Sequence, residues 1–255
     1  MAVLNASGQH RPTIVVPTYN EAENVGPMVE ALLALDLHEQ SVLIVDDASP
    51  DGTGRIADQL ADQYPSRVHV LHRLGQRGLG RAYVDGFRWA LDHGAEAVVQ
   101  MDCDFSHAPR DVLRLVAPLS EYHVVIGSRY VEGGEVAEDW RLGREVLSWW
   151  ANLYTRLILR CPVRDITGGF RAWRRDALEG IDLSAIGSQG YIFQVEMAYV
   201  ASRLGYRMVE VPIYFADRQL GASKMSMQVK LEAALGVWRI WSRHRHLRPG
   251  DRASV

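Results

Sequence analysis

The sequence predicts an α/β fold in which one Rossmann-like, mostly parallel sheet is flanked by helices. The first observation is that short runs rich in β-branched residues alternate with longer segments that have helical spacing of apolar residues. The second is that several of these runs end directly in polar residues. The third is size: 255 residues with 47% hydrophobic content can bury one substantial core, so we expect a single domain.

The first half of the chain supplies most of the predicted sheet. Its helix-like segments carry apolar residues three or four positions apart, so each should bury one face. Because a helix of crossover length separates each pair of strands, the strands should be parallel. The expected strands are residues 13–17, 41–46, 68–73, 97–101 and 124–128, and the expected helices are residues 22–35, 55–64, 80–93 and 110–119.

The second half of the chain departs from strict alternation. There we expect a turn at Gly168 and Gly169. The predicted domain spans residues 1–248, with halves at about 13–128 and 129–248, and a flexible tail covers residues 249–255. The remaining expected elements are helices at residues 144–159, 193–204 and 225–243, and a strand at residues 207–215.

Composition excludes several classes of protein. A formal net charge of −3 and a pI near 6.3 give no global reason to expect nucleic-acid binding. The two cysteines, Cys103 and Cys161, are too few for a disulfide scaffold and are compatible with a reducing cytosol. Residues 1–10 lack the features of a signal peptide, and no window approaches the roughly 18–20 apolar residues of a transmembrane helix. We therefore expect a cytoplasmic protein whose contact with a membrane is peripheral.

Polar loops follow three of the predicted strands and should converge on one crevice, because ligands bind beyond the carboxyl ends of strands in open α/β sheets. These loops are residues 17–21, 46–52 and 102–104. The third places Asp102 and Asp104 at the end of an apolar strand, where Mg²⁺ or Mn²⁺ could be held by carboxylate and phosphate oxygens. Taken alone, the pair is interpreted equally well as a solvated acidic turn that caps the next helix.

The second loop contains two kinds of acidic residue. Asp47 directly follows a buried strand and could accept hydrogen bonds from a nucleobase or ribose. Asp51 and Thr53 have the spacing of turn and helix-capping residues, which is the better interpretation for them. The glycine-containing segment 75–80 opens a helix, but it indicates a dinucleotide site only weakly, since its order is not G-x-G-x-x-G and it follows the third strand.

Five ordered motifs together resemble glycosyltransferase family 2, and within it the dolichol- or polyprenol-phosphate mannose synthase branch. They are Val-Pro-Thr-Tyr-Asn-Glu at 16–21, Ile-Val-Asp-Asp-Ala-Ser-Pro-Asp-Gly-Thr at 44–53, Gly-Leu-Gly at 78–80, Met-Asp-Cys-Asp-Phe-Ser-His at 101–107 and Gly-Ser-Arg at 127–129. The resemblance covers residues 13–224. It implies a GT-A type fold with C-terminal amphipathic helices, in which the first half binds a nucleotide sugar and the second half binds the acceptor.

On the donor side, the resemblance implies a cation held on the sugar nucleotide's diphosphate. Asp102 and Asp104 would bind Mg²⁺ or Mn²⁺, and Ser106 takes the third metal position, where a neutral hydroxyl is a poor ligand that water would supplement. A basic loop at 218–224 would close over the diphosphate. The residues implied in donor binding are Pro17, Tyr19, Glu21, Asp47, Gln76, Gly78, Asp102, Cys103, Asp104, Arg218 and Lys224.

On the acceptor side, the resemblance implies that Arg129 and Arg144 bind a lipid phosphate together with Ser148. Arginine forks match phosphate geometry, and Ser148 lies four residues after Arg144 on the same helix face. The alternative for Arg144 is a solvated charge at a helix start, where the helix dipole does not favour a cation. The segment 165–171, which begins at Asp165, resembles the family's D-x-x-x-G-F turn and supports this side.

The implied reaction moves mannose from GDP-mannose to a polyprenyl monophosphate. We identify no His or Glu that must act as general base. The acceptor explains this, because a phosphate monoester is mostly a dianion at neutral pH and its oxygen is already deprotonated. In-line attack would invert the anomeric carbon and give a β-linked product. The Q-x-x-R-W motif of processive relatives is absent, which favours a single transfer. The alternatives are a UDP-glucose donor and a non-catalytic nucleotide-sugar-binding module.

Two apolar stripes suggest contact with a membrane surface. Residues 146–158 carry Trp149, Trp150 and Leu157 among other apolar side chains, and the last predicted helix combines Trp238 with Trp241 and several arginines, a pattern typical of interfacial helices. Each stripe could equally be core. A separate membrane-anchor protein is a possible partner.

Overall fold

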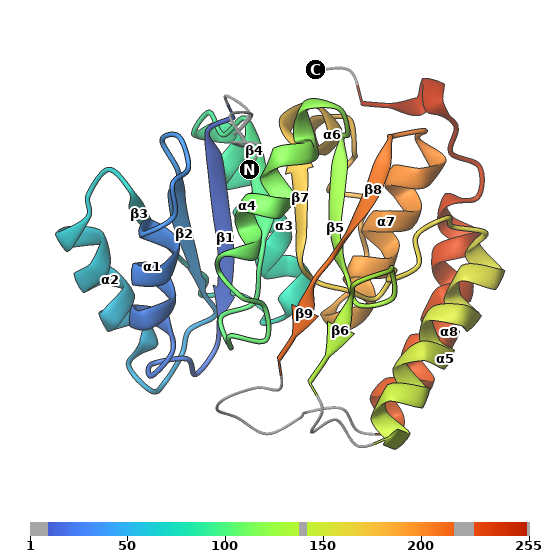
Figure 1. The fold of residues 1–255 in the computed structure, drawn as a ribbon, viewed down its shortest axis with the longest axis horizontal. Helices are drawn as coiled ribbons and strands as arrows, with labels where there is room; N and C mark the ends of the chain where they lie inside the picture. The colour runs from blue at the N-terminus through green and yellow to red at the C-terminus, as the bar shows by residue number, and fades with distance from the viewer. Residues whose placement is uncertain (1–9, 138–141, 217–226, 254–255) are drawn as a thin grey trace.

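The computed structural model describes residues 10–137, 142–216 and 227–253. In the helices that begin at residues 142 and 227, side chains are described from residues 147 and 234 onward, and the side chain of residue 191 is also left out. A seven-stranded sheet runs through both halves of the chain (Figure 1), in the order β3-β2-β1-β4-β7-β5-β8. The strands are β1 (Pro12–Thr18), β2 (Ser41–Asp46), β3 (Val68–His72), β4 (Ala97–Gln100), β5 (Val124–Ser128), β7 (Arg171–Arg174) and β8 (Met208–Pro212).

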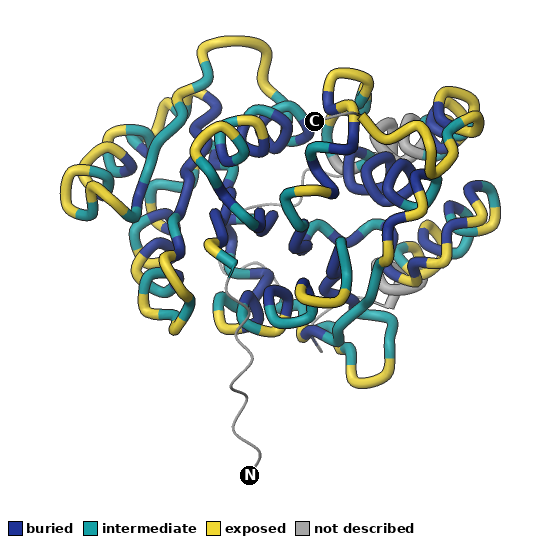
Figure 2. The backbone as a smooth tube through the Cα atoms, turned by 90° about the horizontal axis from the view of Figure 1, so that it is seen from above, coloured by how far each residue is buried: buried dark blue, intermediate teal, exposed yellow. Residues whose placement is uncertain are grey.

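Helices cover both faces of the sheet because alternate strand residues point to opposite sides. Along β1, Ile14 and Val16 join the core under α1, α2 and α4, whereas Val15 joins the core under α3, α6 and α7. Figure 2 shows the strands as a buried layer with exposed residues on the outer helices. The helices are α1 (Val25–Leu33), α2 (Thr53–Gln63), α3 (Leu79–Asp92), α4 (Asp111–Val116), α5 (Leu142–Leu159), α6 (Arg175–Glu179), α7 (Phe193–Arg203) and α8 (Met227–His244).

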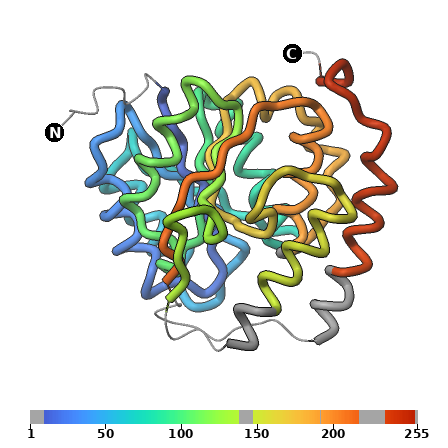
Figure 3. The backbone as a smooth tube through the Cα atoms, turned by 45° about the vertical axis from the view of Figure 1, so that its right-hand side comes forward, coloured from blue at the N-terminus to red at the C-terminus, as the bar shows by residue number. Residues whose placement is uncertain are grey.

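Helices α5 and α8 pack against each other at one end of the molecule, as Figures 1 and 3 show. The hydroxyl of Tyr154 in α5 donates to the carbonyl of Ala234 in α8 and accepts a hydrogen bond from the indole of Trp238. This pair presents large apolar side chains to solvent rather than to the core. The most exposed are Leu147, Trp149, Trp150 and Leu157 of α5 and Leu235 and Trp238 of α8. No helix in the described part of the chain is long and apolar enough to cross a membrane.

The predicted α/β class, with a mostly parallel sheet flanked by helices, is confirmed, and the sequence places the five strands of the first half within a residue at either end. Two strands were missed: β7, which runs antiparallel between β4 and β5 in the main sheet, and the two-residue strand β6 (Glu135–Val136). The strand predicted at residues 207–215 is divided into β8 and the short β9 (Tyr214–Phe215), which pairs with β6 (Glu135–Val136). The division lets the chain leave the main sheet beside the polar loops.

Residues 249–253, within the predicted tail, make hydrogen bonds to the rest of the domain. Residues Pro249–Asp251 form one 3₁₀ turn. Arg252 donates to the carbonyls of Leu204 and Gly205, and the amide of Ala253 donates to the carbonyl of Gly180. These bonds tie residues 249–253 to the ends of α6 and α7.

Candidate active site

The polar loops meet where the strand order reverses. Strands β1, β2 and β3 progress in one direction from the sheet centre, while β4 lies on the other side of β1, so the crevice of an open α/β sheet falls between β1 and β4. Three non-glycine residues in the loops after β1, β2 and β4 have positive φ, namely Asn20 (61°), Ala48 (53°) and Phe105 (58°). Such backbone costs energy and clusters at binding sites. This rim is therefore the first candidate for a site.

The first two loops are fastened to each other. The hydroxyl of Thr53 and the amide of Ala22 both donate to Asp51, at 2.6 Å and 3.1 Å, and the amide of Glu21 donates to the Thr53 hydroxyl at 2.9 Å. The structural interpretation of Asp51 and Thr53 thus agrees with these contacts. Their hydrogen bonds hold the loop that carries Glu21 in place beside the loop that carries Asp47.

Asp47 organises the third loop as well as its own. Its carboxylate accepts hydrogen bonds from the guanidinium of Arg73 and from the amide of Gly78, the latter at 2.9 Å. Gly78 has φ of +152°, a conformation that favours glycine. The structure therefore brings Asp47 and Gly78 together at the N-terminus of α3, as expected of residues that share a pocket.

Tyr19 and Gln76 lie in the same group of contacts. The guanidinium of Arg77 donates to the Tyr19 hydroxyl at 2.7 Å and lies 4.5 Å from the centre of its ring. Gln76 accepts hydrogen bonds through its side chain from Arg81 and through its carbonyl from Arg73. The three arginines were not singled out from the sequence, although they surround the Gly-rich segment 75–80. Arg73 is already paired with Asp47 and Asp85, so Arg77 and Arg81 are the two that make this part of the rim suitable for an anion.

The paired carboxylates lie at the end of β4, next to a buried tyrosine. Tyr83 of α3 donates its hydroxyl to Asp102 at 2.8 Å, and the amide of Ser106 donates to Asp104 at 3.0 Å. Burial raises the pKa of Tyr83 well above 10, and the charge of Asp102 raises it further, so the phenol stays a donor. Burial is also the main cause that raises the pKa of Cys103, and the nearby charge of Glu21 raises it further. The loops after β1 and β4 are thus close neighbours, as the predicted crevice requires.

The oxygen ligands of this loop fit a hard divalent cation that is bound together with a substrate. In the described part of the chain, no three or more His, Cys, Asp or Glu side chains group around a metal position. Asp102 and Asp104 would therefore supply two ligands, and substrate phosphate and water would supply the others, which is how Mg²⁺ is usually held at phosphate sites. Ser106 is buried close by, with its amide bound to Asp104. The donor set fits a cation on a diphosphate rather than a closed protein site.

Arg129 is paired with Asp165, the first residue of the segment 165–171, a contact that the sequence did not predict. Its guanidinium forms two hydrogen bonds of 2.7 Å to the carboxylate of Asp165, and its backbone amide donates to the same carboxylate at 3.0 Å. Asp165 is fully buried and the Arg129 side chain is 9% exposed. Burial disfavours the Asp165 anion, but the charge and hydrogen bonds of Arg129 outweigh it and lower its pKa. Arg129 therefore faces the interior, with its charge already balanced by Asp165.

Ser148 belongs to the same network through α5. The hydroxyl of Tyr130 donates to the Ser148 hydroxyl at 2.8 Å. One turn further along α5, the amide of Asn152 donates to the carbonyl of Ser148 and to the hydroxyl of Thr167, each at 3.0 Å. Thr167 also accepts a hydrogen bond from Arg129. The structure thus brings Arg129 and Ser148, two of the three predicted acceptor residues, onto one hydrogen-bonded frame.

A buried histidine connects the two sides of the crevice. The ring of His107 stacks on Phe170 with 4.8 Å between ring centres, and it lies near the charges of Asp104, Arg129 and Asp165. Burial lowers the pKa of His107 to about 4, so its imidazole is neutral at physiological pH. The neutral ring of His107 therefore adds no charge between the carboxylate loop and the Arg129–Asp165 pair.

Gln194 is a candidate that sequence reasoning missed. Its side chain is 2% exposed, and its Oε1 has no hydrogen-bond partner among the described residues. A side-chain carbon placed on Gly169 would lie 3.2 Å from the Gln194 amide and 3.8 Å from Asp102. The signal in the sequence was a pair of polar residues, Gln194 and Glu196, inside an otherwise apolar helix. A buried amide without a partner beside a charged site suggests a ligand group.

The remaining predicted residues divide into two groups. Pro17 is the last residue but one of β1 and is half-buried at the rim. Arg144 belongs to α5, but its side chain lies outside the described residues, as do Arg218 and Lys224 with their whole loop. The structure therefore brings most of the donor residues to one rim and leaves these three basic side chains undetermined in position.

Comparison with known proteins identifies the family. Residues 13–182 match the family described as Glycosyl transferase family 2. Undecaprenyl-phosphate mannosyltransferase of Micrococcus luteus is 48% identical over 229 residues, 90% of this chain and 93% of that protein. Polyprenol monophosphomannose synthase of Mycolicibacterium smegmatis is 48% identical over 217 residues, 85% of this chain and 81% of that protein.

Solved structures agree with the fold. Glucosyl-3-phosphoglycerate synthase of Mycobacterium tuberculosis, crystallised with Mn²⁺, uridine diphosphate and glucosyl-3-phosphoglycerate, superposes with a TM-score of 0.66 over 94% of this chain and 82% of that chain, at 19% identity. The same enzyme with Mn²⁺ and UDP-glucose also gives 0.66, at 18% identity over 94% and 81%. The chain therefore belongs to glycosyl transferase family 2, and it is a glycosyltransferase with the GT-A fold.

Proposed function

We propose that this chain transfers one mannosyl group from GDP-mannose to a polyprenyl monophosphate and inverts the anomeric carbon, within one domain that spans residues 1–248. The observation that carries the proposal is the placement of Asp102 and Asp104 in one crevice with the frame that joins Arg129 to Ser148. Two relatives at 48% identity, one named an undecaprenyl-phosphate mannosyltransferase and the other a polyprenol monophosphomannose synthase, support the choice of sugar and acceptor.

On the donor side, Asp102 and Asp104 would hold Mg²⁺ or Mn²⁺ against the diphosphate, with Ser106 at the edge of the shell. When bound, the cation would stabilise the charge of the departing nucleoside diphosphate. Support comes from the Mn²⁺ and nucleotide present in solved structures of the same fold. Tyr19, Asp47 and Gly78 would form the nucleotide end of the pocket, because their contacts join the loops after β1, β2 and β3.

On the acceptor side, the chain has to orient a nucleophile rather than create one. The phosphate of a monoester is mostly dianionic at neutral pH, so its oxygen needs no general base. The neutral imidazole of His107 is consistent with this, since a base with a pKa near 4 would give little assistance. Positioning that oxygen opposite the leaving group favours in-line displacement and a β-linked product from an α-linked donor.

Access to a lipid substrate would come from the exposed apolar face of α5 and α8. Trp149 and Trp150 are 52% and 58% exposed, and Leu157 is 69% exposed. Tryptophan and leucine on a helix pair that also carries arginines are typical of segments that lie at a bilayer interface. We propose that the chain attaches peripherally to the cytoplasmic face of the membrane, and that a separate anchoring protein is a possible partner there.

One experiment separates the proposed donor from its main rival. Purified protein is given radiolabelled GDP-mannose or UDP-glucose with a polyprenyl phosphate and Mg²⁺ or Mn²⁺, and label in the lipid phase is counted. We expect transfer from GDP-mannose only, with loss of transfer in EDTA and in Asp104→Ala. Transfer from UDP-glucose instead would contradict the donor assignment, and transfer that persists in Asp104→Ala would contradict the role of the carboxylate pair.

A further inference from the structure

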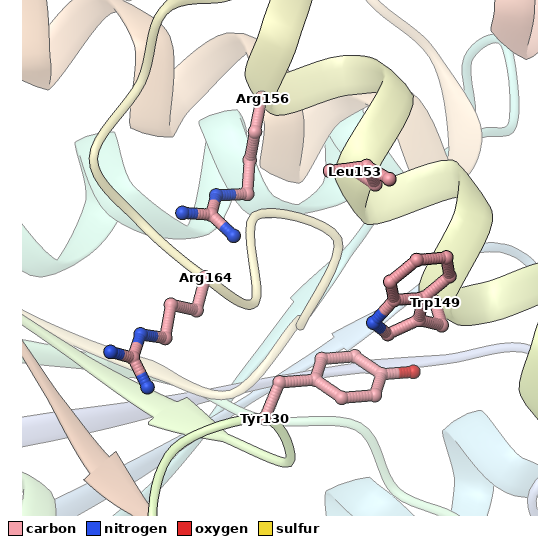
Figure 4. Close-up of a pocket in the computed structure, with 5 residues that line it drawn as sticks. All are labelled: Tyr130, Trp149, Leu153, Arg156 and Arg164. Carbon is pink, nitrogen blue, oxygen red and sulfur yellow. The ribbon is translucent and has the colours of Figure 1, made fainter.

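A pocket lined by two arginines lies beside α5, outside the carboxylate crevice. Its volume is about 380 Å³, and its lining residues are Tyr130, Trp149, Leu153, Arg156 and Arg164 (Figure 4). Trp149, Leu153 and Arg156 are spaced by four and three residues, so they share one side of the helix. Arg164 comes from the segment that follows α5, and Tyr130 comes from the turn after β5. A pocket of this size accommodates a small headgroup.

The charge of this pocket is not balanced by the part of the protein that the structure describes. Neither Arg156 nor Arg164 forms an ion pair with a described acidic side chain, and the Nε of Arg156 is buried without a hydrogen-bond partner there. The carboxylate of Glu210 lies at this segment, where it accepts hydrogen bonds from the backbone amides of Arg164 and Asp165 at 2.7 Å and 2.8 Å. A buried guanidinium donor without an acceptor is costly, and a phosphate is the anion whose geometry fits it.

The pocket adjoins the proposed acceptor site, and its two arginines lie further along the chain than Ser148. Arg156 follows Ser148 by eight residues of α5, which corresponds to roughly 12 Å along the helix axis. Tyr130 joins the two places, because it lines the pocket and donates its hydroxyl to Ser148 at 2.8 Å. The pocket's outer wall is Trp149, which is half exposed and adjoins Trp150 on the apolar face of α5. A phosphate bound here would therefore lie level with the proposed membrane contact.

We propose that this pocket binds the phosphate headgroup of a bilayer phospholipid other than the acceptor, and that Arg156 and Arg164 hold it while Trp149 and Leu153 lie along its glycerol and upper acyl region. The inference rests on the membrane contact that we propose as part of the function. Tryptophan favours the headgroup level of a membrane, and arginine is attracted to its anionic lipids. The bound lipid would fix the depth and rotation of α5, and with them the position of Ser148.

The test compares binding of the full chain to two kinds of vesicle, pure phosphatidylcholine and phosphatidylcholine mixed with phosphatidylglycerol, by co-sedimentation. The variants are Arg156→Lys, Arg164→Gln and the control Arg55→Gln, whose exposed side chain lies on α2 at the opposite end of the molecule (Figure 1). We expect Arg156→Lys and Arg164→Gln each to weaken binding to the mixed vesicles about fivefold, and Arg55→Gln to leave it unchanged.

Arg156→Lys is the decisive variant because it keeps the charge and removes the planar fork. If Arg156→Lys binds the mixed vesicles as tightly as the wild type, diffuse attraction explains binding and the pocket assignment is wrong. Turnover with polyprenyl phosphate in detergent micelles gives a second readout, and we expect no change of KM there. A raised KM in detergent would show that the pocket holds the acceptor's phosphate instead. The vesicle assay does not depend on the donor sugar, so failure of the proposed reaction would be recognised separately.

Discussion

The Arg129–Asp165 pair allows a prediction whose size follows from the structure. Asp165→Asn keeps the shape of the side chain but removes the charge that balances Arg129. The carboxylate accepts the two 2.7 Å guanidinium bonds and the amide bond of Arg129, and it is fully buried. Breaking a buried pair by removing one partner costs about 3–5 kcal/mol, because the remaining charge has no compensation. For a chain of this size each kcal/mol lowers Tm by roughly 2 °C, so we expect a fall of about 6–10 °C.

The assay is urea and thermal unfolding followed by circular dichroism, with Asp176→Asn as the matched control. Asp176 pairs with Arg174 at 2.6 Å, but the two side chains are 49% and 29% exposed, and such pairs contribute about 0–1 kcal/mol. Because the folded-state pKa of Asp165 is lowered, its stabilisation is present above its ordinary value of 3.8 and is lost as pH falls below that value. If Asp165→Asn destabilises the protein no more than Asp176→Asn at neutral pH, the reasoning about burial is refuted.

Three further predictions concern Gln194, Glu196 and Arg144. Gln194→Met should change the free energy of unfolding by less than about 1 kcal/mol, since the Oε1 of Gln194 has no hydrogen-bond partner to lose in the described part of the chain, yet reduce kcat/KM at least tenfold; unchanged kinetics would remove Gln194 from the site. Glu196→Gln should cost roughly 2–4 kcal/mol at pH 7, measured by urea unfolding. Burial opposes ionisation of Glu196, but hydrogen bonds from His244 and Ser188 lower its pKa to about 2, so the wild type should lose this stabilisation as pH falls from 4.5 towards 2 and the variant should lack that dependence. Arg144→Ala should raise the KM for polyprenyl phosphate far more than it weakens donor binding by calorimetry, and an equal loss of both would reject its acceptor role.

The sequence predicted the first half of the fold well because its signals are local there. In β1 and β2, β-branched residues are buried on both faces and a polar residue ends each strand, so both boundaries are marked. Strand β7 was missed because it is four residues long and begins and ends with arginine. Arg171 is nevertheless fully buried, and its guanidinium donates to the carbonyls of Ile166, Gly168 and Gln194. No strand pattern indicates that two carbonyls of the preceding turn and one from the start of α7 will surround an arginine.

The same distinction applies to the candidate site. The donor loops were predictable because each follows a strand end, and strand ends of a parallel sheet meet at one edge. The partners of those residues were not: Arg73 binds Asp47 from 26 positions away, and Asp165 binds Arg129 from 36 positions away. Motif spacing identifies the residue types at a site, whereas the balance of charge depends on contacts that only the folded chain creates.

That balance alters what each arginine can contribute to binding the acceptor. The guanidinium of Arg129 is paired with the carboxylate of Asp165 through two hydrogen bonds, so the pair brings no net positive charge to the crevice. The free-energy cost of burying the Arg129 cation is already offset by Asp165. A phosphate dianion beside Asp102 and Asp104 would then depend for its charge compensation on the cation at the diphosphate and on basic groups without a buried partner. We therefore expect the proposed role of Arg129 to be positioning, through Thr167, Asn152 and Ser148, while Arg144 supplies the charge. On this reasoning Arg129→Lys should act mainly on stability, because it breaks the two-bond contact with Asp165, and Arg144→Ala should act mainly on acceptor affinity.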